Sequence, residues 1–157
     1  MTMVNNVTRF LDSRKVTYQT HELPPEKLGA IEAAEILGVS PDRVYKTIVA
    51  IRTIPGKPIL AVIPGNTELD LKLLAIVAGE KKIRLASHQQ AEDLTKLQTG
   101  GISPLLLIHK GFQVFVDRQA LDYPTIYISG GQRGLNIQLS PNDLVKLTSA
   151  RVETISH

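Results

Sequence analysis

Two neighbouring segments rich in β-branched and aliphatic residues constrain the fold of this chain most strongly. Residues 44–52 and 58–64 flank a Pro-Gly turn at 54–57, so they are predicted to form two strands in succession. Alternate side chains of a strand face opposite sides, and in 44–52 both sides are largely apolar. This strand is therefore expected to lie in the interior of a sheet.

Helix signals and further strand signals alternate along the rest of the chain. Capping residues, prolines and glycines at segment ends predict a short turn at 40–42 and helices at 4–13, 30–37, 67–79, 87–94 and after Ser140-Pro141. Alternation predicts strands at 16–21, 82–86, 113–116, 125–129 and 135–139. Because the order is not strictly βαβ and no linker is visible, we predict one α+β domain over residues 1–157 with a mixed sheet.

The composition excludes several kinds of site. The 157 residues contain no cysteine, which removes disulfides, thiolate metal ligands and a cysteine nucleophile together. The four histidines are scattered without metal-ligand spacing and no G-x-S-x-G motif occurs, so no metal or cofactor is predicted. With no apolar run of about 18 residues and no signal sequence at the N-terminus, a cytoplasmic protein outside the membrane is expected.

The chain is mildly basic, with a formal net charge of +3 and a pI near 9.2. This balance favours a polyanionic partner without establishing one. The basic cluster Lys81, Lys82 and Arg84 could contact a nucleic-acid backbone, although such a run is more often simply a solvated face.

Lys46 is the first candidate for chemistry. It shares one side of the strand 44–52 with Val44, Ile48 and Ala50, so its ammonium is expected to be partly desolvated. A desolvated ammonium can bind phosphate or a developing oxyanion, or it can lose its proton and act as a base. The alternative is a strand lysine whose side chain reaches water.

Two glycine-rich segments are the second candidate, Thr99-Gly100-Gly101-Ile102-Ser103-Pro104 and Ser129-Gly130-Gly131-Gln132-Arg133-Gly134. Paired glycines let backbone N–H groups approach an anion or an oxyanion closely. The second segment adds Ser129 and Arg133, whose guanidinium suits phosphate or carboxylate. The alternatives are a Gly-Gly turn fixed by Pro104 and an ordinary hairpin loop. Neither segment has the following helix that dinucleotide and P-loop fingerprints require.

Taken together, these motifs resemble a known family. In order along the chain they are Glu32-Ala33-Ala34-Glu35, Leu37-Gly38, Val44-Tyr45-Lys46-Thr47, Gly100-Gly101-Ile102-Ser103-Pro104 and the stretch from Ile126 to Leu135. The order and spacing are similar to the YbaK/EbsC family of aminoacyl-tRNA deacylases, relatives of the editing domain of bacterial prolyl-tRNA synthetase. The resemblance covers nearly the whole chain.

The resemblance implies a prolyl-tRNA editing domain-like fold, with a mixed, mostly antiparallel, barrel-like sheet surrounded by helices. It implies hydrolysis of the ester in mischarged proline tRNA, most of all Cys-tRNA(Pro), beside prolyl-tRNA synthetase and without a cofactor or a protein nucleophile. The substrate's own thiol would attack the ester. Lys46 would hold the terminal adenosine or its phosphate, and Gly101 would position the reacting carbonyl. The implied substrate-binding residues are Thr20, Thr47, Gly100, Ile102, Ser103, Ser129, Gly130, Gly131, Arg133 and Asn136.

The sequence also departs from the family pattern. Thr20 and Gly29 stand where aromatic residues are frequent, and Asn136 stands where some relatives carry aspartate. These changes bear on the shape of the pocket and hence on the amino acid removed. The stretch 105–108 is unusually apolar, which predicts either core packing or a self-association surface.

Two other functions stay open at this level. One is a non-catalytic module of the same fold that binds tRNA or the synthetase, which the altered pocket positions favour. The other is a small-nucleotide-binding protein that uses the glycine loops for phosphate. The sequence leaves the oligomeric state open.

Overall fold

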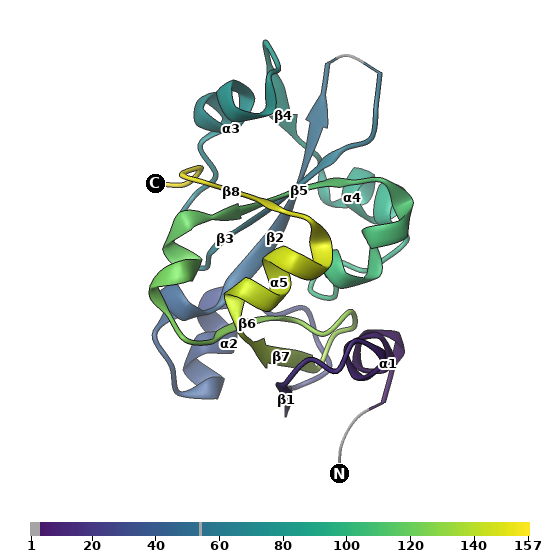
Figure 1. Ribbon diagram of the computed structural model, residues 1–157, viewed down its shortest axis with the longest axis vertical. Coiled ribbons are helices and arrows are strands. Elements are labelled where there is room, and N and C mark those ends of the chain that lie inside the picture. The colour runs from purple at the N-terminus through teal and green to yellow at the C-terminus, as the bar shows by residue number, and fades with distance from the viewer. Residues whose placement is uncertain (1–3, 54) are drawn as a thin grey trace.

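Eight strands form two sheets in the computed structural model, which describes residues 4–53 and 55–157. The smaller sheet has the order β1-β7-β6, with β1 at Tyr18–Glu22, β7 at Leu135–Leu139 and β6 at Ile126–Ser129. The larger sheet has the order β4-β2-β3-β5-β8, and its strands are Ile83–Leu85, Tyr45–Arg52, Ile59–Pro64, Gln113–Asp117 and Arg151–Glu153. Figure 1 shows the smaller sheet below the larger one.

The pairing is mixed and mostly antiparallel. The pairs β1–β7, β6–β7, β2–β3 and β2–β4 are antiparallel, whereas β3–β5 and β5–β8 are parallel. A parallel bridge between Val44 and Tyr127 connects the two sheets beside β2. The α+β prediction and the interior position of the strand at 44–52 are confirmed, and the strands form two sheets rather than a closed barrel.

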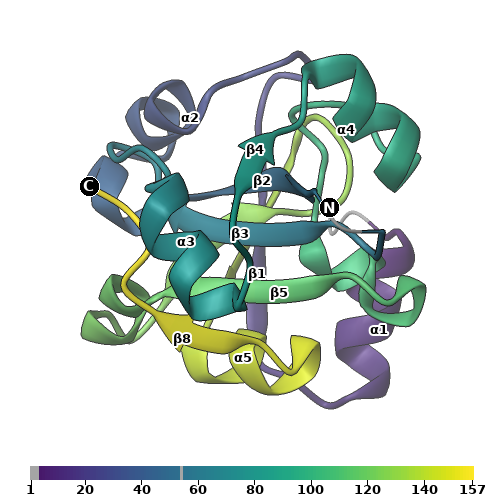
Figure 2. The same cartoon turned by 90° about the horizontal axis from the view of Figure 1, so that it is seen from above.

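Five α-helices lie within the described residues: α1 (Asn6–Ser13), α2 (Ala30–Leu37), α3 (Leu71–Ala78), α4 (His88–Thr95) and α5 (Pro141–Thr148). Short 3₁₀ segments occur at Pro41–Arg43, Pro104–Leu106, Ile108–Lys110 and Arg118–Asp122. Figure 2 shows α3 over one face of the larger sheet, with α5 on the opposite side. Within residues 4–53 and 55–157, no helix has the length and apolarity needed to cross a bilayer.

The core is divided by the larger sheet, whose strand β3 is buried along its whole length. Ile59, Ala61 and Ile63 pack in one cluster with residues of α3, whereas Leu60 and Val62 belong to a second cluster with α1, α4, α5 and the smaller sheet. This division follows the period of two along a strand. Residues 105–108 also belong to the second cluster, with Leu105 and Leu107 buried, so the core-packing alternative for this apolar stretch is confirmed.

Most helix ends agree with the local signals, and α3 is the exception. The N-cap of α3 is Asp70, whose Oδ1 accepts a hydrogen bond from Leu73 N–H at 3.0 Å. Thr67, the predicted cap, instead donates its hydroxyl to Pro64 O at 2.8 Å, so the predicted capping box at 67–70 is wrong. The sequence signals also missed β8, and Ile54 of the predicted turn lies outside the described residues.

The carboxylate of Asp117 fastens the C-terminal segment to the end of β5. The side chain is 1 % exposed, Oδ1 accepts from Gln119 N–H at 2.9 Å, and Oδ2 accepts from Ile155 N–H at 3.2 Å and Ser156 Oγ at 2.7 Å. Because both oxygens face N–H donors, an amide in this place must turn its NH₂ toward one of them.

We therefore expect Asp117→Asn to lower the free energy of unfolding by about 1–3 kcal/mol, the cost of leaving a buried donor without an acceptor. Urea unfolding followed by circular dichroism measures this change. Asp93→Asn, at an exposed position of α4, is the matched control and is expected to change stability little. Equal unfolding free energies for the two variants would contradict the anchoring role.

Candidate active site

A cavity of about 560 Å³ lies between the larger sheet, α2, α4 and the end of the smaller sheet. One wall is β2 with the preceding residue, because six consecutive residues, 44–49, line the cavity. Other walls come from the segment 26–30 with the start of α2, from Leu85, Ala86 and His88, from the loop 99–102, and from the ends of β6 and β7.

Lys46, on β2, is one of the residues that line this cavity. Its side chain is half-buried, and Nζ donates a hydrogen bond to Gly65 O at 3.3 Å. Burial lowers the pKa of Lys46 below its ordinary value of 10.5, and the carboxylate of Glu68 acts in the opposite direction. A cation that has lost part of its hydration and has one weak protein partner can engage an incoming anion or a polarised oxygen strongly.

Gly65, whose carbonyl accepts the hydrogen bond from Lys46, lies where a side chain would not fit, and sequence reasoning did not single it out. A Cβ atom on Gly65 would lie 2.6 Å from Ala30 Cβ and 2.9 Å from Val44 O. The Gly65 N–H donates to Val44 O at 2.7 Å, and this bond fixes the Gly65 peptide whose carbonyl oxygen accepts from Lys46. The only local signal for this role is the Pro-Gly pair that ends β3.

The two glycine-rich loops, 99–104 and 129–134, pack directly against each other. A Cβ atom on Gly101 would lie 2.9 Å from Gln132 Cα and 3.1 Å from Gln132 C, so the backbones touch. Arg133 Nε also donates to Thr99 O at 2.8 Å. Thr99 and Gly100 line the cavity. Gly101 does not, and its N–H donates to Gln98 O at 2.8 Å within the same loop. The structure thus brings together the two segments that the sequence singled out.

The predicted site residues divide into two groups by position. Those that line the cavity are Lys46, Thr47, Gly100, Ile102, Ser129 and Asn136. Those outside its lining are Thr20, Gly101, Ser103, Gly130, Gly131 and Arg133.

Several members of the second group hold the loops in shape. Ser103 Oγ accepts from Leu105 N–H at 3.3 Å, and the Gly130 N–H donates to Leu135 O at 2.8 Å. The Gly131 N–H donates to Ser129 Oγ at 3.2 Å, which orients this hydroxyl. Thr20 lies on β1, opposite Ile137 of β7.

Asn136 is a buried polar side chain of the cavity wall. It pairs with Ser129 across the β6–β7 hairpin and is only 6 % exposed. Its Oδ1 has no hydrogen-bond partner within the described chain. A buried acceptor without a donor costs free energy in the folded protein.

We expect Asn136→Leu, a replacement of similar size, to keep or raise the melting temperature of the unliganded protein. The substitution removes a buried acceptor oxygen without breaking any hydrogen bond to that oxygen. Thermal unfolding by differential scanning calorimetry measures the change. The matched comparison is Thr148→Val, because the Thr148 hydroxyl is buried and donates to Leu144 O at 2.7 Å. A fall for Asn136→Leu as large as that for Thr148→Val would show that Asn136 has a structural partner.

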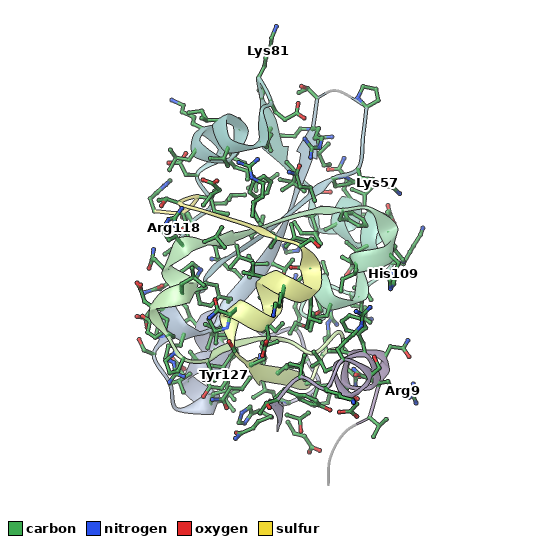
Figure 3. All side chains as sticks on the ribbon, in the orientation of Figure 1. Arg9, Lys57, Lys81, His109, Arg118 and Tyr127 are labelled. Carbon is green, nitrogen blue, oxygen red and sulfur yellow. The ribbon has the colours of Figure 1, made fainter. Side chains whose placement is uncertain are left out.

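Basic groups occur in the cavity wall and in the segment that precedes Leu85 in the sequence. Lys27 Nζ donates to His88 Nδ1 at 2.9 Å, and this contact connects the segment before α2 with the first turn of α4. The exposed cluster Lys81, Lys82 and Arg84 directly precedes the wall residues around Leu85. Figure 3 shows Lys81 extending into solvent at the end of the molecule formed by α3 and β4. No group of three histidine, aspartate or glutamate side chains suited to a metal ion occurs in residues 4–53 and 55–157.

Comparison with known proteins gives consistent matches. The sequence model of a family described as the aminoacyl-tRNA editing domain matches residues 24–147. A protein of Enterococcus faecalis, EbsC, named as a candidate Cys-tRNA(Pro)/Cys-tRNA(Cys) deacylase, is 36% identical over 153 residues, which are 96% of this chain and 92% of EbsC. A proline–tRNA ligase of Maridesulfovibrio salexigens is 34% identical over 111 residues, which are 70% of this chain but only 18% of the ligase.

Two solved structures support the fold. The hypothetical protein APE2540 superposes with a TM-score of 0.89 at 29% identity, and the match covers 98% of this chain and all of that one. A candidate trans-editing enzyme for prolyl-tRNA synthetase superposes with a TM-score of 0.79 at 23% identity over 99% of each chain. At this low identity the second likeness concerns the fold alone.

Proposed function

The chain belongs to the aminoacyl-tRNA editing domain family, and we propose that it is a trans-editing hydrolase that deacylates mischarged proline tRNA, with Cys-tRNA(Pro) as its main substrate. The observation that carries the proposal is the half-desolvated ammonium of Lys46 in a cavity of about 560 Å³ walled by both glycine-rich loops. The name of EbsC, which this chain matches over nearly its whole length, supports the same substrate class.

The chemistry that fits these residues is substrate-assisted. The cysteine thiolate of the substrate attacks its own carbonyl carbon, a C–S bond forms, and the ester C–O bond to the ribose breaks. The ribose oxygen takes up the proton that the thiol has released, and water opens the resulting thiolactone. The protein's part is to hold the ester and stabilise charge, for which a preorganised cation in a cavity is effective. The chain needs no nucleophile of its own for this reaction.

Each wall has a role in this proposal. Lys46 holds the terminal adenosine or its phosphate, and the peptide of Gly100 lies beside the reacting carbonyl. Gly101 sets the position of that peptide through its close packing on Gln132. Ser129 and Asn136 line the part of the cavity that receives the amino acid.

The partners follow from the relatives. The match to one segment of a proline–tRNA ligase supports a free-standing editing role. In this role the synthetase charges the tRNA, and this chain removes the wrong amino acid in trans beside it in the cytoplasm. The exposed basic cluster at 81, 82 and 84 lies next to the cavity wall and contacts the tRNA backbone. The net charge of +3 is small, so tRNA affinity depends strongly on salt and gains from the synthetase.

The decisive experiment measures loss of the amino acid from proline tRNA charged with cysteine, alanine, serine or proline. The purified protein is expected to release cysteine fastest, and the correct amino acid, proline, at the rate seen in buffer. If no charged tRNA loses its amino acid faster than in buffer, the hydrolase proposal is wrong. Tight tRNA or synthetase binding without turnover would instead support a non-catalytic module.

A further inference from the structure

One edge of β2 has no strand beside it where it borders the cavity. At its start Val44 bridges to Tyr127 of β6, and at its end Ala50–Arg52 pair with β4. Between these points residues 45–49 have β3 on one side and the cavity on the other. Side chains of one face alone would line a cavity at every second residue. The unbroken lining by 44–49 therefore means that the strand edge itself faces the cavity.

The direction of the backbone groups on this edge follows from two hydrogen bonds. Val49 O accepts from Ala86 N–H at 3.0 Å on the open side, whereas Val44 O accepts from Gly65 N–H at 2.7 Å on the β3 side. Both groups of a residue point to the same edge in an antiparallel ladder, and the edge alternates from residue to residue. The N–H and C=O of Thr47 therefore point into the cavity, and no residue of the described chain pairs with them there.

An aminoacyl group carries the N–C–C=O unit of a strand residue. One residue can satisfy both the N–H and the C=O of a single opposite residue only in the hydrogen-bonded pair of an antiparallel ladder. We propose that the Thr47 backbone binds the substrate amino acid in this way. The Thr47 C=O accepts from the α-ammonium, and the Thr47 N–H donates to the ester carbonyl. This inference rests on the proposed function, because it assigns the aminoacyl group to the open edge.

The surroundings of the open edge fit an amino acid. Opposite residues of an antiparallel pair place their side chains on the same face. The substrate side chain then lies on the face of Thr47, where the apolar residues Val49, Ala91 and Ile102 line the cavity. Asn136, which pairs with Ser129 across the β6–β7 hairpin, adds a polar side chain to the lining of the same cavity.

The test uses a pair of analogues that cannot be hydrolysed. One carries cysteine in amide linkage to 3′-amino-3′-deoxyadenosine, and the other carries 3-mercaptopropionate, which lacks only the α-ammonium. Loss of a charged hydrogen bond is expected to weaken binding about 10- to 100-fold in calorimetric titration. In ¹H–¹⁵N spectra the Thr47 amide is expected to show one of the largest shifts with the cysteinyl compound.

A protein variant provides a third measurement. Proline at position 47 removes an N–H that faces the open edge, a place where strands tolerate proline. Thr47→Pro is expected to keep a cooperative thermal transition and to bind the cysteinyl analogue about 10-fold more weakly. If this variant fails to fold, the analogue pair and the amide spectra on the parent protein decide the question.

The outcomes separate the inference from the proposed function. Equal affinity for the two analogues, or a Thr47 amide that stays unmoved on saturation, overturns the inference even where cysteine is released from tRNA. Binding that depends on the α-ammonium, in a protein that deacylates no tRNA, supports the inference and overturns the proposed function.

Discussion

Replacing Lys46 by alanine is expected to slow the release of cysteine from proline tRNA by at least about 100-fold, with the fold intact. The substitution removes the half-buried cation from the cavity, and its hydrogen bond to Gly65 O is long at 3.3 Å, so little structure depends on it. Single-turnover deacylation measures the rate. Lys146→Ala, on the exposed side of α5, is the matched control and is expected to leave the rate within about twofold. A Lys46→Ala variant as fast as this control would remove Lys46 from the mechanism.

The same lysine has a predictable effect on stability. Burial lowers the pKa of Lys46, so the folded protein holds the proton less tightly than the unfolded chain does. The charged side chain therefore costs stability in full below the lowered pKa, and this cost is lost as the pH rises from there toward 10.5. Lys46→Met is expected to melt at or above the temperature of the parent at pH 7, with the difference shrinking toward pH 10. A lower melting temperature at pH 7 would contradict this.

Gly101→Ala is expected to lower the free energy of unfolding by about 2–4 kcal/mol. The new Cβ would lie 2.9 Å from Gln132 Cα, 3.1 Å from Gln132 C and 3.2 Å from Arg133 N. These are backbone atoms that cannot rotate away, so the two loops must separate. Gly56→Ala is the control, because its Cβ would meet only Arg52 Cδ, at 3.7 Å. Urea unfolding compares the two, and equal stability would show that the loops can move apart freely.

The Gly101 variant also tests whether loop packing serves the reaction. When the loops separate, the peptide of Gly100 moves at the cavity surface, so deacylation is expected to fall even well below the melting temperature. The rate is measured at a temperature where circular dichroism shows the variant fully folded. A destabilised variant that keeps the parental rate would assign Gly101 to folding alone.

The sequence predicted best those features whose causes are local. Helix α2 runs from Ala30 to Leu37, as predicted, because the glycine that follows adopts φ 71° and ends the helix. The predicted start of α3 was wrong because contacts with the distant C-terminal segment determine where this helix begins. The N–H groups of Glu68 and Asp70 donate to the carbonyls of His157 and Ile155, which extends the loop and moves the first helical turn beyond it.

The candidate site shows the same division. The order of motifs indicated Lys46 and the two loops, and the structure brings these segments together around one cavity. Sequence could not show that Gly65 supports the lysine, or that Asn136 keeps an unpaired oxygen, since both depend on contacts between distant strands. The open edge of β2 could not be predicted either. No pattern within 44–52 shows that β4 pairs only with residues 50–52 and that β6 bridges only at Val44.

An unpaired strand edge normally exposes a protein to fibril-like addition of further chains. Here the free stretch is short, 45–48, because Val44 bridges to β6 before it and Val49 O accepts from Ala86 N–H after it. A second polypeptide would have to break one of these contacts before it could extend along the edge. The molecule can therefore keep unpaired backbone groups inside its cavity without offering a template for aggregation.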